Sequence, residues 1–332
     1  MTSAHASATT AKNPAAAPAL PQRTVPAPKY LCPVITPFRE DGSIDADACR
    51  THWNKLCAAG LDGILLLGSM GEFFALDAAR KQELIRLAGA ELAGKTHLMV
   101  GTGANSVAQS VELSRYAFDH GADSVILIAP YYMRLSEEDL FAHFSQIAQA
   151  LADNPVYLYN FPDRTGNPLT GPLIRKLVEK HPNVVGIKDT ISDVAGTRQL
   201  IAEVSPLAPD FIFYSGMDEN FFHNVLAGGN GCIAGLSNVF PEVCAAGVAA
   251  IQENDLSRIR SVQRILDAAS ALYGVVTFFP AAIKEATRQR GLDISPRSAA
   301  TSAPLTEEAR TQISGILAQV EALMEAEGIA TT

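Results

Sequence analysis

Short apolar runs alternate with longer helical stretches from Tyr30 onward, and this repeat constrains the fold more than any other feature of the sequence. The eight runs are YLCPVIT (30–36), GILLLG (63–68), HLMVGT (97–102), DSVILIA (123–129), VYLYN (156–160), VVGIK (184–188), FIFYS (211–215) and GCIAG (231–235). Most of them begin roughly 30 residues after the previous one, which is the length of a strand followed by a helix. Eight such units predict a parallel sheet that closes into a (β/α)8 TIM barrel.

The segments between these runs have the spacing of amphipathic helices. Residues 77–93, for example, place Leu84, Leu87 and Ala88 at helical spacing and put charged residues on the other face. Nearly continuous apolar strands between helices indicate a parallel sheet that is covered on both faces. A doubly wound sheet is the rival fold, but no G-x-G-x-x-G motif follows the first strand, which disfavours that fold.

The chain divides into three parts by composition and pattern. Residues 1–28 are rich in Ala, Pro, Ser and Thr and show no apolar period, so we expect a disordered N-terminal tail. The repeat predicts the barrel over residues 29–240. Residues 241–332 hold more helical pattern than one unit requires, which predicts a barrel-closing helix followed by a C-terminal helical extension.

Charge and composition favour a small-molecule partner. The formal net charge is −9, and no Lys/Arg cluster is longer than a dipeptide, so the basic footprint of a nucleic-acid binder is missing. The longest apolar runs fall far short of the roughly 20 residues that a membrane span needs. We therefore expect neither a nucleic-acid nor a membrane partner.

The cysteines and histidines give no sign of a disulfide framework or a metal site. The five cysteines form no C-x-x-C pair, and we interpret them as reduced thiols of a cytoplasmic protein. The seven histidines form no H-E-x-x-H motif. We expect no metal and no other cofactor.

The run VVGIK ends on a charged side chain, at the end of the strand where such barrels carry their chemistry. Among nine lysines, Lys188 is the one that directly terminates an apolar run. Burial makes an ammonium release its proton more readily, and the neutral amine can then attack a carbonyl. The alternative is a strand-end lysine that reaches water or pairs with Asp189.

The stretch YNFPDRTG (159–166) supplies two further candidates, one strand earlier. Tyr159 ends its strand, and a phenol beside a protonated imine can exchange protons with the substrate. The alternative is a buried tyrosine with a satisfied hydroxyl. Arg164 could present its guanidinium to a carboxylate, or could pair with Asp163 at the surface.

Two loops add weaker signals. GSMGE (68–72) is a glycine-framed turn whose N–H groups could bind a carboxylate and whose Ser69 adds a hydroxyl, although such a motif is often only a turn. PYYMR (130–134) places two tyrosines in a loop, which is typical of a subunit interface.

Together these motifs resemble the family of dihydrodipicolinate synthase and N-acetylneuraminate lyase, the pyruvate-dependent class I aldolases. GSMGE is similar to the family's G-[ST]-x-G-E turn, YNFPDRTG to its Y-N-x-P tyrosine motif, and GIKDT (186–190) to its Schiff-base lysine strand. The resemblance extends over roughly 29–330 and implies a pyruvate-dependent carbon–carbon lyase that needs no metal or bound cofactor.

The resemblance also implies a role for each matching position. Lys188 would form the Schiff base and Tyr159 would shuttle protons. Ser69 and the backbone of Met70 would hold the pyruvate carboxylate, with the Ser69 hydroxyl relaying protons. Tyr132 matches a tyrosine that a neighbouring subunit contributes, which implies a homo-oligomer, either a dimer or a tetramer. Arg164 and Ile233 would contact substrate.

The substrate stays open among several alternatives. Synthases of the lysine pathway typically carry two hydroxyl residues in the turn, whereas here Met70 follows Ser69. GIKDTISDV, YSGMDENFF and the helical tail are more similar to the branch that acts on 2-oxo-3-deoxy sugar acids, which favours an aldolase that forms pyruvate and an aldehyde. Arg164 favours dihydrodipicolinate synthase, which condenses pyruvate with aspartate semialdehyde. A dehydratase that uses the same imine and a non-catalytic barrel that binds 2-oxo acids are further alternatives.

Overall fold

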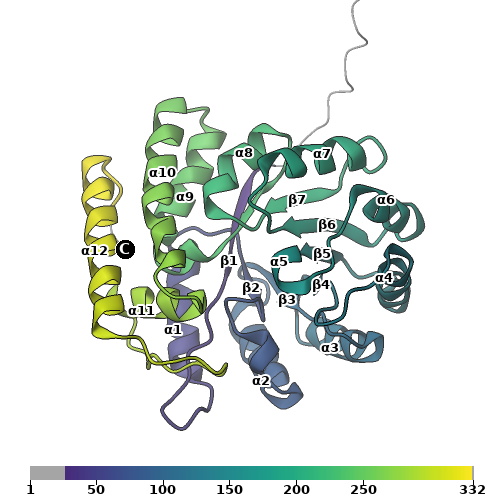
Figure 1. The fold of residues 1–332 in the computed structure, drawn as a ribbon, viewed down its shortest axis with the longest axis horizontal. Coiled ribbons are helices and arrows are strands. Elements are labelled where there is room, and N and C mark those ends of the chain that lie inside the picture. Colours follow the sequence, from purple (N-terminus) through teal and green to yellow (C-terminus); the bar gives the residue numbers. More distant parts are fainter. Residues whose placement is uncertain (1–26, 331–332) are drawn as a thin grey trace, which may run out of the picture.

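The structure is a computed structural model that describes residues 27–330, and the barrel predicted from the repeat is confirmed (Figure 1). Its strands are β1 (Lys29–Pro33), β2 (Gly63–Leu66), β3 (His97–Gly101), β4 (Ser124–Ile128), β5 (Val156–Asn160), β6 (Val184–Asp189), β7 (Ile212–Ser215) and β8 (Gly231–Ile233). Each strand pairs in parallel with the next, and β8 pairs with β1, so the sheet is closed.

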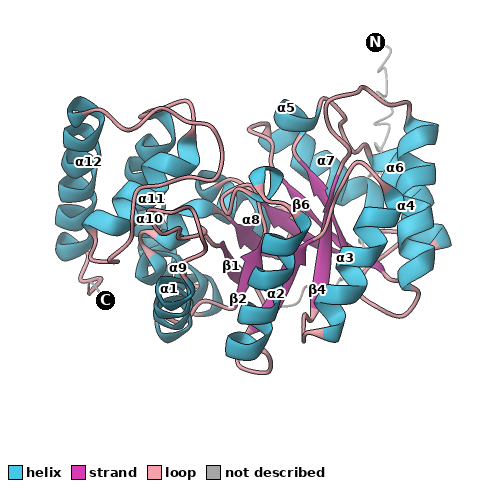
Figure 2. Ribbon diagram, turned by 90° about the horizontal axis from the view of Figure 1, so that it is seen from below, coloured by secondary structure: helices cyan, strands magenta, loops and turns pink. Residues whose placement is uncertain are grey.

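Helices surround the closed sheet and cover its outer face, as Figure 2 shows. They are α1 (Ala46–Ala58), α2 (Ala78–Leu92), α3 (Val107–Asp119), α4 (Glu137–Leu151), α5 (Pro162–Thr165), α6 (Gly171–Lys180), α7 (Val194–Val204), α8 (Phe221–Leu226) and α9 (Pro241–Gln252). The helical face predicted within residues 77–93 is confirmed, since Leu84 and Ala88 of α2 are fully buried.

The strands are buried on both faces, which explains why their sequences do not alternate between polar and apolar residues. One set of side chains packs against the helices and the other fills the barrel. On β5 and β6, Tyr157 pairs in register with Gly186, and a Cβ at position 186 would lie 2.4 Å from the Tyr157 ring. Glycine at this position therefore gives the tyrosine ring its space inside the barrel.

The C-terminal helices predicted after residue 241 are present. α10 (Leu256–Ala269), the 3-10 turn η4 (Ser270–Gly274), α11 (Phe279–Gln289) and α12 (Glu307–Ala326) follow α9. Figure 1 shows α12 outermost, beside α10. The pattern over 256–274 suggests one helix, but the α-helix ends at Ala269 and continues as η4.

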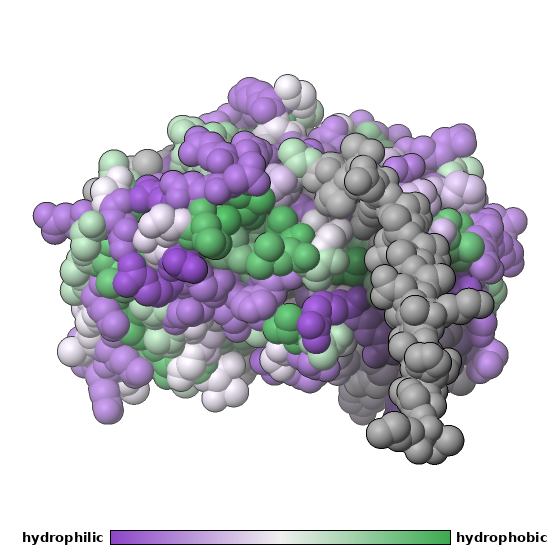
Figure 3. Space-filling view, turned by 90° about the horizontal axis from the view of Figure 1, so that it is seen from above, coloured by the Kyte–Doolittle hydropathy of each residue, from purple (hydrophilic) through white to green (hydrophobic). Residues whose placement is uncertain are grey.

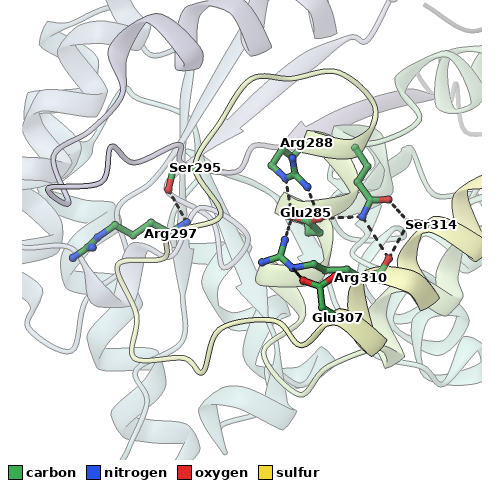
Figure 4. Close-up of polar contacts among 8 residues, drawn as sticks. Glu285, Arg288, Ser295, Arg297, Glu307, Arg310 and Ser314 are labelled. Carbon is green, nitrogen blue, oxygen red and sulfur yellow. Dashed lines mark hydrogen bonds and ion pairs between the residues drawn. The ribbon is translucent and has the colours of Figure 1, made fainter.

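A buried ionic cluster joins α11 to α12. The Glu285 carboxylate, which is fully buried, accepts hydrogen bonds from Arg288 and forms an ion pair of 3.1 Å with Arg310 (Figure 4). A buried carboxylate needs such partners, because an unpaired charge in the interior is costly. The cluster therefore fixes α12 against α11.

Three further expectations concern the N-terminal tail, membrane-spanning segments and the cysteines. The tail predicted over 1–28 lies outside the described residues, apart from its last two positions. Across residues 27–330 no helix is long and apolar enough to cross a membrane. The face drawn in Figure 3 mixes apolar and polar side chains in small patches. All five cysteines are free thiols, and four of them are buried.

Candidate active site

Lys188 lies near the carboxyl end of β6, and its side chain is 4% exposed. The Lys188 side chain is therefore largely shielded from solvent. Asp189, the other partner that the sequence suggested, is engaged elsewhere: its carboxylate accepts hydrogen bonds from Asn160 (2.8 Å) and Thr197 (2.9 Å). Burial raises the pKa of Asp189, and these two hydrogen bonds oppose that shift. The Lys188 amine instead faces the ring of Tyr159, with Nζ 4.4 Å from the ring centroid.

Tyr159 and Ser69 come from different parts of the barrel and meet at the lysine. The Tyr159 hydroxyl and the Ser69 Oγ share a hydrogen bond of 3.2 Å. Tyr159 lies near the carboxyl end of β5, next to Lys188 on β6, whereas Ser69 follows β2. The carboxyl ends of the strands converge in a barrel, and this convergence brings the three side chains to one point.

The turn that carries Ser69 is tightly constrained. Gly71 N donates to Gly68 O (3.1 Å), and the Thr36 hydroxyl donates to Gly71 O (2.9 Å). Position 71 must be small, since a Cβ there would lie 2.9 Å from Val34 O. Glu72 closes the turn with φ 60°, a left-handed conformation that non-glycine residues rarely adopt.

A cavity of about 490 Å³ contains most of the residues that the sequence singled out. Lys188, Tyr159, Ser69, Met70 and Arg164 line it. Further parts of its wall come from Pro33, Phe161, Asp163, Thr190, Ser192, Gly216, Met217, Glu219, Ala234, Gly235, Ser270, Tyr273, Gly274, Val276, Thr277 and Phe279. A polar cluster at the bottom of a cavity of this size is typical of a small-molecule site.

A second cavity of about 450 Å³ adjoins the first. Its wall is mainly aromatic and includes Phe73, Phe74, Tyr131 and Phe278. The two cavities share Ser69, Phe161, Arg164, Thr277 and Phe279. Arg164, on the short helix α5, lies over the rings of Phe161 (5.7 Å) and Phe279 (5.8 Å), at the boundary between the cavities.

Two of the predicted site residues do not line either cavity. Tyr132 is 93% exposed, and its backbone is in the positive-φ region at φ 80°. Ile233 is fully buried at the end of β8, and the two residues after it, Ala234 and Gly235, line the larger cavity instead.

Sequence reasoning missed two polar residues of the larger cavity. Thr190 Oγ1 and Glu219 Oε2 are buried, and neither has a hydrogen-bond partner within the described part of the chain. Unsatisfied buried oxygens are uncommon and require an explanation such as a bound ligand. The sequence signal that could have identified Thr190 was its position directly after the strand that carries Lys188.

Tyr273 of the cavity wall is held by a buried carboxylate. Its hydroxyl donates to Asp218 (2.5 Å), as does the hydroxyl of Tyr30, and Leu236 N donates to the same carboxylate (3.2 Å). Burial raises the pKa of Asp218 to about 6, and the two tyrosine hydrogen bonds oppose the shift. This network fixes the part of the cavity wall that carries Tyr273.

A barrel that brings an amine, a phenol and a hydroxyl together at the carboxyl ends of its strands has the arrangement that covalent catalysis through an amine requires. The chain belongs to the Dihydrodipicolinate synthetase family, whose model matches residues 28–320. This assignment confirms the family resemblance and the class of enzyme inferred from the motifs.

Two relatives of this chain are named as aldolases. The putative 2-dehydro-3-deoxy-D-gluconate aldolase YagE of Escherichia coli K12 is 34% identical over 289 residues, which cover 87% of this chain and 95% of YagE. The probable 2-dehydro-3-deoxy-D-pentonate aldolase YjhH of the same organism is 32% identical over 285 residues, covering 86% and 94%.

Solved structures agree with these relationships. The crystal structure of YagE in complex with pyruvate has a TM-score of 0.86 at 33% identity and covers 89% of this chain and 98% of that one. The 4-hydroxy-tetrahydrodipicolinate synthase of Methylacidiphilum fumariolicum SolV has a TM-score of 0.85 at 29% identity, covering 92% and 99%. The two kinds of relative therefore share this fold almost equally.

Proposed function

We propose that this protein is a Schiff-base-forming aldolase that cleaves a 2-oxo-3-deoxy sugar acid into pyruvate and an aldehyde, or forms the acid from them. The observation that carries the proposal is the buried amine of Lys188, 4.4 Å from the ring centroid of Tyr159 inside a cavity of about 490 Å³. Membership of the family, and the names of YagE and YjhH, support the same activity.

The geometry supports a complete reaction without an added co-reactant. The neutral amine of Lys188 attacks C2 of the 2-oxo acid, the Tyr159 hydroxyl gives its proton to the departing oxygen, and water leaves, so that a protonated imine and a Tyr159 phenolate form. Tyr159 accepts the proton of the C4 hydroxyl, and the electron pair of the C3–C4 bond moves into the iminium, giving an aldehyde and an enamine. The proton returns to C3, and water hydrolyses the imine to release pyruvate. Ser69 hydrogen-bonds Tyr159 (3.2 Å) and can relay the proton.

The backbone of the turn after β2 is the proposed anchor for the pyruvate carboxylate. Ser69 and Met70 both line the cavity next to Lys188. Successive N–H groups in a tight turn attract an anion, since they present aligned partial positive charges. Replacing a second hydroxyl residue by Met70 leaves these backbone donors in place.

Two polar groups in the cavity wall favour a polyhydroxylated substrate. Thr190 Oγ1 and Glu219 Oε2 have no partner among the described residues, and a carboxylate accepts hydrogen bonds from sugar hydroxyl groups. The same Glu219 charge would repel the carboxylate of aspartate semialdehyde, since like charges at close range are unfavourable. The sugar acid therefore fits this cavity better.

One observation favours the synthase as a second candidate. Arg164 lines the cavity, and its guanidinium can bind a carboxylate in a bidentate manner. Condensation of pyruvate with aspartate semialdehyde would use this contact.

The quaternary structure and the compartment belong to the same proposal. Tyr132 is 93% exposed and strained at φ 80°, which supports a role across a subunit interface in a homo-oligomer. Free thiols, such as the five in this chain, persist where the environment is reducing, which supports the cytoplasm.

Borohydride reduction in the presence of pyruvate tests the central claim. We expect a pyruvate adduct on the peptide that carries Lys188 and none in Lys188→Met. Lys284 is an internal control, because it is 1% exposed yet lines neither cavity. Absence of any adduct in the folded protein, with pyruvate still bound in calorimetry, would favour the non-catalytic barrel.

Product analysis then separates the reactions that share the imine. An aldolase gives pyruvate and an aldehyde from a 2-oxo-3-deoxy sugar acid, whereas a dehydratase keeps the carbon chain whole. A cyclised product from pyruvate and aspartate semialdehyde would establish the synthase instead.

A further inference from the structure

A second lysine is buried in the protein, on a helix and not on a strand. Lys284 on α11 is 1% exposed and forms an ion pair of 2.8 Å with Glu72, which is fully buried. The two residues are 212 positions apart in the chain. Neither side chain lines the two cavities, so the pair has no direct contact with a ligand there.

Glu72 belongs to the turn proposed to hold the pyruvate carboxylate. Its N–H donates to Ser69 O (3.2 Å), and its backbone is left-handed at φ 60°. Such a conformation persists only when its surroundings enforce it. The side chain of Glu72 is the part of the turn that reaches into the C-terminal region, and its contacts there can hold the backbone in place.

Both carboxylate oxygens of Glu72 are occupied by that region. Oε1 accepts from Lys284 Nζ, and Oε2 accepts from Ala300 N (3.0 Å). Lys284 Nζ also donates to Arg297 O (2.8 Å) and lies 4.8 Å from the ring centroid of Phe38. The pair therefore joins the barrel turn, α11 and the loop after α11 in one buried network.

A buried ion pair contributes little net stability, because desolvation of both charges offsets their attraction. Its effect is mainly geometric when both partners make additional directional hydrogen bonds, as Glu72 and Lys284 do. A hydrogen bond of 3.2 Å between Ser69 and Tyr159 is sensitive to small shifts of the turn.

We propose that Glu72 and Lys284 are positioning residues that hold the turn of Ser69 and Met70 in the geometry that binds the pyruvate carboxylate beside Lys188. The inference rests on the proposed function and assigns the C-terminal extension a part in it. Loss of the pair displaces the turn, so pyruvate binds more weakly while the amine of Lys188 keeps its own surroundings.

Three variants test the proposal. Glu72→Gln keeps the shape of the side chain and removes its charge. The double variant E72Q/K284M removes both charges and leaves no unpaired ion, so it tests the pair even if the single variant fails to fold. Glu285→Gln is the matched control, because Glu285 is the next residue on α11, is equally buried, and pairs with Arg288 and Arg310 (Figure 4).

The readout is the fraction of Lys188 trapped by borohydride as a function of pyruvate concentration, with the melting temperature measured in parallel. We expect half-saturating pyruvate to rise by about tenfold to a hundredfold in E72Q and in the double variant, with complete trapping still reached at high pyruvate. Glu285→Gln is expected to lower the melting temperature and leave half-saturation unchanged.

Two results would overturn the inference. A folded double variant with the parent's half-saturation would show that the pair does not position the turn. An equal shift in E285Q would show that loss of any buried charge on α11 has the same effect. Failure of the parent protein to trap pyruvate is a different result, because it removes the proposed function itself.

Discussion

Tyr159 and Lys188 occupy paired positions on β5 and β6, two strands that are hydrogen-bonded to each other in the barrel. Their spacing is therefore set by the backbone ladder of a closed sheet and does not depend on loops. A proton-transfer group and a nucleophile that sit on rigid elements keep their mutual geometry through the reaction, which favours catalysis.

Tyr159→Phe keeps the ring that faces Lys188 and removes the hydroxyl bonded to Ser69. We expect turnover to fall by roughly 10²- to 10⁴-fold, the usual contribution of a positioned acid or base. Borohydride should still trap pyruvate on Lys188 after long incubation. Pyruvate release measured with a coupled assay checks the prediction, and turnover within twofold of the parent would exclude a proton-transfer role.

Glu219→Gln tests how the cavity recognises the part of the substrate that becomes the aldehyde. The variant keeps the size of the side chain and removes the charge, so we expect kcat/KM for a 2-oxo-3-deoxy sugar acid to fall by roughly tenfold, which corresponds to about 1.4 kcal/mol. The pyruvate concentration that half-saturates trapping should not change. If the variant weakened pyruvate trapping by the same factor, Glu219 would act on the pyruvate half of the substrate and not on the aldehyde half.

Arg164→Gln separates the two candidate activities. The guanidinium lies between aromatic rings at the boundary of the two cavities. With a neutral sugar aldehyde as acceptor we expect condensation rates within about threefold of the parent, because the substrate offers no second carboxylate to bind. A loss of about a hundredfold or more, measured with aspartate semialdehyde, would favour the synthase.

His52→Gln is expected to change the acid sensitivity of the fold. Burial lowers the pKa of His52 to about 4, and its Nδ1 has no partner in the described chain, while Nε2 lies 2.9 Å from Asn238 Oδ1. Between pH 6.5 and about 4 the unfolded state binds more protons at this residue than the folded state does. The free energy of unfolding therefore falls as the pH falls through this window.

Urea unfolding at pH 7, 6 and 5 measures this effect. Glutamine cannot be protonated there and can still donate to Asn238, so the difference between parent and variant should shrink with decreasing pH, by up to about 1.4 kcal/mol per pH unit. A difference that is constant across pH would mean that His52 titrates alike in both states.

The strands and the three central side chains were predictable because each leaves a local pattern in the sequence. A general rule, that strand ends converge in a barrel, then brings the three side chains together. An apolar run that ends on Lys188 can be recognised in the sequence, and convergence of strand ends brings it to Tyr159 and Ser69. The end of β1 at Pro33 was less predictable. Residues 34–36 remain buried, and Val34 N still donates to Leu65 O of β2 (3.1 Å), but Ile35 N donates to the side chain of Asn238 instead of to a strand.

Contacts between residues that are far apart in the sequence could not be predicted from such local patterns. Lys284 lies in a segment with several polar residues, and its tertiary partners, the Glu72 carboxylate and Arg297 O, account for its burial. The spacing of Pro280, Ile283 and Lys284 on one helical face was the available hint. The role assigned to Tyr132 requires a second chain, and a single sequence contains no information on how copies pack.

The lining of the larger cavity comes from separate parts of the chain. Residues 69–70, 159 and 188 surround the proposed carbon–carbon chemistry, whereas residues within 216–219 and 270–279 form much of the remaining wall. For directed evolution of a biocatalyst, mutations can therefore be confined to the second group. Such a library would change which aldehydes are accepted and would leave the covalent step to residues that it does not alter.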